Sequence, residues 1–255
     1  MRLGCCVPRT QIPAARKAGY DFVELTVVDN LRPAEGEEVW QALRAEIRAG
    51  GLPVEAANVF FPGDWRLTGP EADLAATRAY VDAAVRRAAE LGIAVMVFGS
   101  GRARSAPAGF PVARALEQVR DVLAVMGDAG ARHGVAIALE PLRRAETNLV
   151  HTVAEAVEIV RPLGHPWVGV LADYYHMQEE QEPLNSLLDA GHLLRHVHVS
   201  DPDRGAPTGQ HDLADLFAYL RQAGYRGRIS VECRWEDWER EAPEAATLLR
   251  SYLAA

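Results

Sequence analysis

Acidic and imidazole side chains occur at or just after the ends of four successive apolar segments in the second half of the sequence. The four residues are Glu140, Asp173, His198 and Glu232. Three carboxylates and one imidazole make a hard, mostly oxygen donor set, which suits Mn²⁺, Mg²⁺ or Co²⁺ and would also accept Zn²⁺. Such a cation would stabilise Glu140, because a buried carboxylate without a cationic partner tends to become protonated. The four residues therefore predict a binding site for one divalent metal ion.

A simpler explanation exists for each of these residues on its own. A single carboxylate at the end of a strand is commonly a surface group, and a single histidine in an apolar strand is commonly a hydrogen-bonded core residue. Four successive segments that end in the same way are harder to explain by chance. This recurrence is the reason for preferring a metal site.

The apolar segments have the length and composition of buried β-strands, and each is followed by a stretch with helical periodicity. Strands that are apolar on both faces and alternate with helices predict a single-domain (β/α)8 TIM barrel over residues 1–255. A doubly wound open sheet is the alternative, but its usual glycine-rich nucleotide motifs are missing. The predicted strands are Leu3–Val7, Phe22–Val28, Pro53–Val59, Ile93–Phe98, Val135–Glu140, Trp167–Ala172, Arg195–Val199 and Arg228–Glu232.

The alternation of side chains along these strands predicts which residues face one another. Residues two apart in a strand point to the same side, and the carboxyl ends of barrel strands carry the active site. Ala138 and Glu140 would therefore face inwards together, as would His196 and His198. His196 lies one layer deeper and is predicted to be a core histidine. Glu24 could contact a substrate or close a buried polar network, and the second is the preferred prediction.

Helix boundaries are marked by capping and stop signals. Pro70 is predicted to open a helix over Glu71–Leu91, which Gly92 would end. Thr152 and Glu155 have the spacing of a capping box, which predicts a further helix after them.

Two arginines follow a glycine-rich turn after the fourth predicted strand. Arg102 and Arg104 come directly after Gly99-Ser100-Gly101. Arginines beside such a turn could bind a phosphate group. They could equally be exposed residues of a solvated loop, and the sequence does not decide between the two.

The overall composition favours a protein that acts on small molecules. The 255 residues are 49% hydrophobic and carry a formal net charge of −8, which argues against a nucleic-acid partner because that function needs a concentrated basic surface. No segment has the length of a membrane span, and the first residues lack the pattern of a signal peptide. The three cysteines form neither a disulfide framework nor a zinc motif. These features predict a cytoplasmic protein without a membrane partner.

The spacing of the polar residues resembles that of a known family, the xylose isomerase-like TIM barrels. Within that family, the resemblance is to the sugar phosphate isomerases/epimerases and the ketose 3-epimerases. It implies Glu140, Asp173, His198 and Glu232 as metal ligands, with Glu140 and Glu232 also as the catalytic pair. The motifs that carry it are Glu140 with Glu146, Asp173 with His176 in Asp-Tyr-Tyr-His-Met, His198 with Arg204, and Glu232 in Ser-Val-Glu-Cys. By the same resemblance, the substrate-binding residues would be Glu146, His176 and Arg204.

The chemistry implied by this resemblance is the movement of a proton next to a ketone. A divalent metal would stabilise the enediolate that forms when that proton leaves. Glu140 and Glu232 would then act in turn as base and acid on opposite faces of the sugar. The expected function is therefore that of a metal-dependent sugar isomerase or epimerase, with a ketose or a related small sugar as substrate.

Other functions remain open on the same set of residues. An inosose-type dehydratase or a hydroxypyruvate isomerase could use the same site, because both begin with a comparable proton transfer. An AP endonuclease-type site needs further histidines, but Asn58 and Ser100 occupy the expected positions and only His211 is an additional candidate. A sugar-binding barrel without turnover is disfavoured by the pair Glu140 and Glu232. The identity of the sugar, its phosphorylation and the association of copies into homo-oligomers are not determined.

Overall fold

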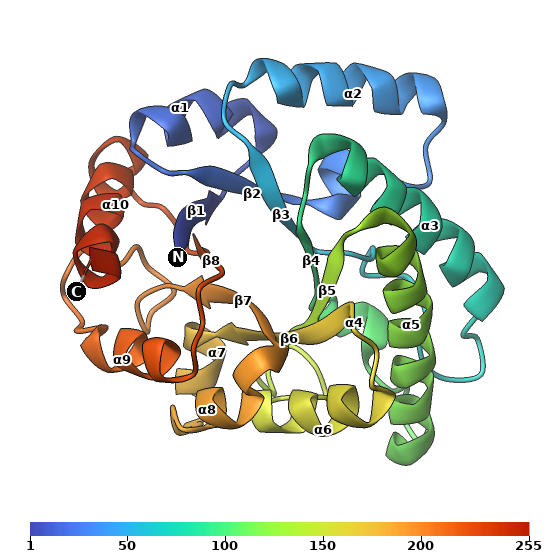
Figure 1. Cartoon of the computed structure of the whole chain (residues 1–255). Helices are drawn as coiled ribbons and strands as arrows, with labels where there is room; N and C mark the ends of the chain where they lie inside the picture. Colours follow the sequence, from blue (N-terminus) through green and yellow to red (C-terminus); the bar gives the residue numbers. More distant parts are fainter. Residues whose placement is uncertain (255) are drawn as a thin grey trace.

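The computed structural model describes residues 1–254 and contains one closed barrel of eight parallel strands (Figure 1). The strands follow one another around the barrel in chain order, and the last pairs with the first. All eight predicted strands are confirmed, and no strand end differs from the prediction by more than two residues. They are β1 (Arg2–Cys6), β2 (Phe22–Thr26), β3 (Val54–Asn58), β4 (Val95–Phe98), β5 (Ala136–Leu139), β6 (Val168–Asp173), β7 (Leu194–Val199) and β8 (Arg228–Val231).

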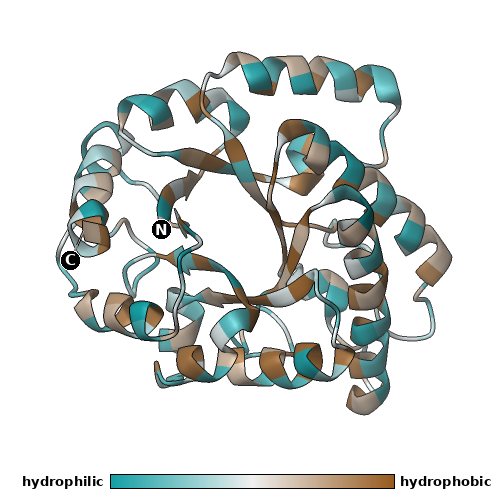
Figure 2. Cartoon of the chain, in the orientation of Figure 1, coloured by the Kyte–Doolittle hydropathy of each residue, from teal (hydrophilic) through white to brown (hydrophobic). Residues whose placement is uncertain are grey.

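Helices form a ring around the barrel. Figure 2 shows mainly hydrophobic strands, whereas the helices carry both hydrophobic and hydrophilic residues, as expected for elements with one buried side. Over residues 1–254, no helix is long and apolar enough to cross a membrane. The helices are α1 (Ile12–Lys17), α2 (Glu37–Ala49), α3 (Leu74–Leu91), α4 (Gly101–Arg104), α5 (Val112–His133), α6 (Val153–Leu163), α7 (Tyr174–Glu179), α8 (Ser186–Ala190), α9 (Ala214–Gln222) and α10 (Trp238–Ala254).

The start of α3 differs from the prediction. The helix begins at Leu74 rather than Glu71, because the Asp73 carboxylate accepts hydrogen bonds from the backbone N–H groups of Ala75 and Ala76, both at 2.9 Å. Asp73 is therefore the N-cap, and a capping acid is a stronger start signal than a proline three residues earlier. The predicted end is confirmed, since Gly92 adopts the left-handed conformation with φ of +83°.

The strands separate a small inner core from a larger outer one. Phe22, Val97 and Ala138 belong to the inner cluster, whereas Ile137 and Leu139 pack outwards against the helices. The alternation predicted for β5 is therefore confirmed. The closed end of the barrel depends on a glycine, because a Cβ atom at Gly4 would lie 2.3 Å from the ring of Phe22.

Arg104 is a structural anchor of the loops at the carboxyl ends of the strands. Its side chain is fully buried, and its guanidinium donates hydrogen bonds to the carbonyl oxygens of Phe98 at 3.1 Å, Glu140 at 2.7 Å and Val150 at 3.3 Å. Burial lowers the pKa of Arg104 to about 10, so the group still carries its charge at neutral pH. Both sequence interpretations of Arg104, a phosphate ligand and an exposed loop residue, are therefore wrong.

Replacement of Arg104 should destabilise the protein. We expect Arg104→Met to lower the free energy of unfolding by about 3 kcal/mol, because three carbonyl oxygens lose a charged hydrogen-bond donor in a place that water does not reach. Urea unfolding followed by circular dichroism measures the change. Arg102→Met is the matched control, since Arg102 lies on the same short helix but is exposed. Equal stability of the two variants would contradict the anchoring role.

Candidate metal centre

The carboxyl ends of four neighbouring strands bring the predicted ligands together. Glu140 follows β5, Asp173 ends β6, His198 lies near the end of β7, and Glu232 follows β8. One donor atom of each residue lies within 4.8 Å of those of the other three. Strand register contributes to this arrangement, because Asp173 and His198 are direct partners across the β6–β7 pair.

The two ring nitrogens of His198 have different surroundings. Nε2 lies 3.0 Å from Oε1 of Glu24, while Nδ1 lies 3.3 Å from Oε1 of Glu140 and 3.1 Å from Oε2 of Glu232. Nδ1 is buried and makes no hydrogen bond of good geometry with its described surroundings. Burial lowers the pKa of His198, but the charges of Glu24 and Glu232 outweigh it and raise that pKa well above its usual range, which favours a proton on Nδ1 facing the carboxylates. A divalent metal ion could take the place of that proton while Nε2 still donates its hydrogen bond to Glu24, so the donor set fits such an ion.

Glu24 closes a buried polar network beneath this cluster. Its second oxygen, Oε2, lies 2.7 Å from Nε2 of His196, and the hydroxyl of Ser230 lies 3.2 Å from the same nitrogen. All of these side chains are buried. The sequence predictions for Glu24 and for His196 as the deeper histidine are therefore confirmed. A carboxylate behind a histidine fixes the orientation of the ring, which is the usual arrangement around protein metal ions.

The cluster has more negative charge than its neighbours neutralise. Burial raises the pKa of Glu140 above its usual range, and the charges of Glu232 and Asp173 raise it further. Burial also opposes ionisation of Glu232, but His198 and Arg204 outweigh it and hold the pKa of Glu232 below its usual range. The negative charge of Glu140 is therefore costly, and a bound dication would lower that cost.

Arg204 is bound directly to two of the candidate ligands. Its guanidinium donates hydrogen bonds to Oδ2 of Asp173, at 2.7 Å, and to Oε2 of Glu232, and it lies over the ring of Tyr175 at 4.6 Å. The backbone of Arg204 has a φ of +65°, which is uncommon for a residue with a side chain and costs energy. The loop after β7 thus holds this arginine in a strained position at the candidate metal centre.

The other two predicted substrate residues lie beside Arg204 along one cavity of about 260 Å³. His176 is buried, with Nε2 3.7 Å from Oδ2 of Asp173, and Glu146 forms an ion pair with Arg143 at 2.9 Å. Glu146 is not part of the donor cluster. His211, considered as an additional ligand, is exposed and does not line this cavity.

A second cavity, of about 430 Å³, adjoins the first on the side of β1 and β2. The two share Asn58, Val59 and Glu232 in their walls. Together they leave room for a ligand of several polar groups at the mouth of the barrel, with Glu232 between the two halves.

Two residues that position the glutamates were not recognised in the sequence. The amide of Asn58 donates a hydrogen bond to Oε1 of Glu232 at 2.9 Å. A Cβ atom at Gly99 would lie 2.2 Å from Oε2 of Glu140, so only glycine leaves room for that carboxylate. Asn58 could have been found, because it ends β3 on the same face as the inward-facing Ala56. Nothing in the sequence distinguishes Gly99 from an ordinary turn glycine.

Comparison with known proteins agrees with this architecture. The chain is 29% identical to the L-ribulose 3-epimerase of Methylomonas sp. (strain DH-1) over 231 residues, which cover 88% of this chain and 77% of that protein. It is 35% identical to the 3-dehydro-D-guloside 4-epimerase of Escherichia coli (strain K12) over 120 residues, 46% of each protein. The crystal structure of the apo 3-keto-D-glucoside 4-epimerase from E. coli superimposes with a TM-score of 0.80 at 24% identity, covering 98% of this chain and 99% of that one. Residues 12–252 match the family model of the xylose isomerase-like TIM barrel, and the chain therefore belongs to that family.

Proposed function

We propose that the protein is a divalent-metal-dependent epimerase or isomerase of a small ketose or related keto sugar. The observation that carries the proposal is the pair Glu140 and Glu232, whose carboxylates approach the same nitrogen of His198 from the ends of two strands at the wall of the first cavity. The similarity to an L-ribulose 3-epimerase over most of the chain supports a ketose as substrate.

Four residues would hold the cation: Glu140, Asp173, His198 and Glu232. When bound, the cation would supply Lewis acidity that lowers the cost of negative charge on the oxygen of the substrate carbonyl. Three carboxylates and one imidazole suit Mn²⁺, Mg²⁺ or Co²⁺ better than a thiophilic metal.

The two glutamates would move the proton. One carboxylate oxygen removes the proton from the carbon beside the carbonyl, and a carboxylic acid on the opposite face returns a proton, which inverts that carbon. Asn58 and Arg204 hold the carboxylate of Glu232 through both of its oxygens, and the space at Gly99 admits Glu140. Both groups are therefore fixed in place before the substrate binds.

The remaining polar groups of the cavity would hold the sugar. The carboxylate of Glu146 can accept hydrogen bonds from hydroxyl groups, and His176 can donate or accept according to its tautomer. The guanidinium of Arg204 can donate to a substrate oxygen while it remains paired with Asp173. The proposed substrate is accordingly a molecule with several adjacent oxygens.

A second candidate is the 4-epimerisation of a 3-keto sugar. It uses the same chemistry, because the proton that moves is again on the carbon next to a ketone. The E. coli relative, a 3-dehydro-D-guloside 4-epimerase, favours it, as does the additional cavity beyond Glu232, which offers space for a substituent on the sugar. A substrate panel should therefore contain both free ketoses and 3-keto glycosides.

The two glutamates provide the direct test of the reaction. We expect Glu140→Gln and Glu232→Gln each to lower turnover by at least about 100-fold, because an amide cannot exchange a proton with carbon. The measurement is the incorporation of deuterium into substrate in D₂O without a change in carbon skeleton. Glu158→Gln, at an exposed position of α6, is the control and should retain activity. Full activity of both active-site variants would refute the proposal, and a dehydrated product would indicate a lyase instead.

Removal of the metal should destabilise the protein and abolish activity. A ligand that binds only the folded state at about 100 times its Kd adds about 2.7 kcal/mol of stability. We expect chelation to lower Tm and Mn²⁺ to restore it, with one ion per chain by metal analysis. Asp173→Asn should lose most of this Mn²⁺-dependent rise. A chelated protein that keeps its activity would contradict metal dependence.

The carboxylate behind His198 should tune the affinity for the metal. We expect Glu24→Gln to weaken Mn²⁺ binding by about 10–100-fold, because a neutral amide holds the proton of His198 Nε2 less strongly and leaves Nδ1 a poorer ligand. Isothermal titration with Mn²⁺ measures this change. Glu24→Asp, which restores the charge at a shorter reach, should recover part of the affinity. Unchanged Mn²⁺ affinity in Glu24→Gln would show that the carboxylate does not orient the ligand.

A further inference from the structure

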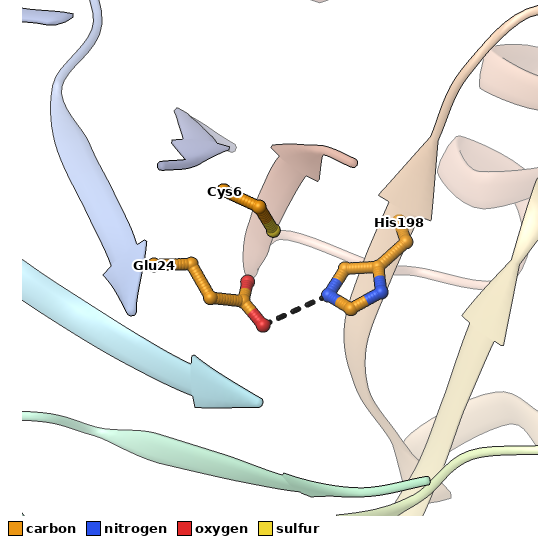
Figure 3. A group of neighbouring side chains, drawn as sticks. All are labelled: Cys6, Glu24 and His198. Atoms are coloured by element: carbon orange, nitrogen blue, oxygen red, sulfur yellow. Dashed lines mark hydrogen bonds and ion pairs between the residues drawn. The ribbon is translucent and has the colours of Figure 1, made fainter. Parts of the chain in front are cut away.

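His198 also belongs to a second group of potential metal ligands, which has no role as a cation site in the proposed reaction. The sulfur of Cys6, a carboxylate oxygen of Glu24 and a ring nitrogen of His198 all lie within 4.8 Å of one another. Figure 3 shows these side chains directed towards a common space from β1, β2 and β7, with Glu24 and His198 joined by a hydrogen bond.

This second group differs chemically from the oxygen-rich centre. It offers one sulfur, one nitrogen and one oxygen donor, a combination that selects borderline and soft cations such as Zn²⁺ and Cd²⁺ over Mn²⁺ or Mg²⁺. Cys6 and Glu24 both line the cavity of about 430 Å³, which gives an ion a path of entry and room for a water ligand. Cys5 cannot substitute, because it packs in the outer core on the other face of β1.

The hydrogen bonds of Glu24 allow it to change partner without leaving its place. Oε2 is held by His196 at 2.7 Å, while Oε1 accepts the hydrogen bond from His198. A cation that takes Oε1 would therefore leave the side chain anchored through Oε2. The Nε2 atom of His198 would then be free to coordinate the same ion.

A neutral imidazole has only one nitrogen lone pair, so His198 can serve one of the two donor groups at a time. With the proton on Nε2, the lone pair of Nδ1 faces Glu140, Asp173 and Glu232. With the proton on Nδ1, the lone pair of Nε2 faces Cys6 and Glu24, and the proton can be donated to Glu140 or Glu232, which lie 3.3 and 3.1 Å from Nδ1.

We propose that Cys6, Glu24 and His198 form a second, thiophilic cation site that competes with the oxygen-rich centre for His198. On binding, the Cys6 thiol releases its proton to solvent and its sulfur bonds to the cation. In the Mn²⁺-loaded protein, where His198 is neutral, its proton is lost from Nε2 and one is gained at Nδ1 as Mn²⁺ leaves, so that one proton is released per ion bound and no electron is transferred. When this site is occupied, His198 can no longer serve as a ligand of the oxygen-rich centre formed by Glu140, Asp173, His198 and Glu232. This consequence rests on the function proposed above.

The test adds Cd²⁺ to the Mn²⁺-loaded protein and follows two signals. Ultraviolet thiolate-to-cadmium charge-transfer absorption reports binding at Cys6, and electron paramagnetic resonance reports Mn²⁺ released to solution. In the wild type, we expect one equivalent of Cd²⁺ per chain to produce the absorption and to release Mn²⁺ in equal amount. In Cys6→Ser, we expect Cd²⁺ affinity to fall by more than about 100-fold. A fall of this size exceeds the one expected from the loss of a residue that only hydrogen-bonds to a metal ligand.

The controls separate the second site from the function proposed for the first. Cys233→Ser should keep the absorption band and the release of Mn²⁺, and Cys6→Ala should behave as Cys6→Ser. A band that persists in both Cys6 variants would overturn the assignment, and simultaneous retention of Mn²⁺ and Cd²⁺ would overturn the competition.

If the wild type binds no Mn²⁺ but shows the Cys6-dependent band, the proposed function fails and the cysteine site stands. If the wild type catalyses Mn²⁺-dependent deuterium exchange but shows no Cys6-dependent absorption band, the proposed function stands and the cysteine site fails.

Discussion

The hydrogen bond between Glu24 and His198 is the interaction on which the polar end of this barrel depends. It joins β2 to β7 across the interior and determines which ring nitrogen of His198, Nδ1, is directed towards the three carboxylates at the mouth. Because both side chains are buried, the contact between them, rather than bulk solvent, sets the orientation of the ring. Everything that we propose for the centre, coordination by Nδ1 as well as competition at Nε2, follows from this single contact.

The barrel interior is arranged in layers of increasing polarity. The floor contains Phe22 and other apolar side chains, the next layer contains Glu24 with His196, and the mouth contains the donor cluster. Strand alternation produces these layers, because each inward position is two residues further along its strand than the one below. The apolar floor lowers the local dielectric constant, so the charges above it interact more strongly than they would at a surface.

The sequence was sufficient for the barrel and for the four candidate ligands, because periodicity of two along a strand and the position of a strand's end are both local properties. It was not sufficient for Arg104, which is buried only because three carbonyl oxygens from separate segments meet around it. Gly99 was missed for the same reason, since its neighbour Glu140 is distant in the chain. The predicted start of α3 is wrong because two local signals, Pro70 and Asp73, lie close together and the helix begins at the capping acid. Contacts between distant segments are therefore what sequence periodicity does not supply.

Closure of the barrel has a consequence for the way the protein is made. β8 pairs with β1, with Leu3 opposite Ile229, and one candidate ligand lies just beyond β8. The donor set can therefore be complete only after the chain has been synthesised beyond Glu232, and contacts between such distant segments form late and slowly. Until then, Glu140 and Asp173 can meet in the nascent chain without His198 or Glu232. If the four residues hold a metal ion, the complete set requires β5 to β8 to have assembled, so such an ion would mark a chain that has folded as far as β8.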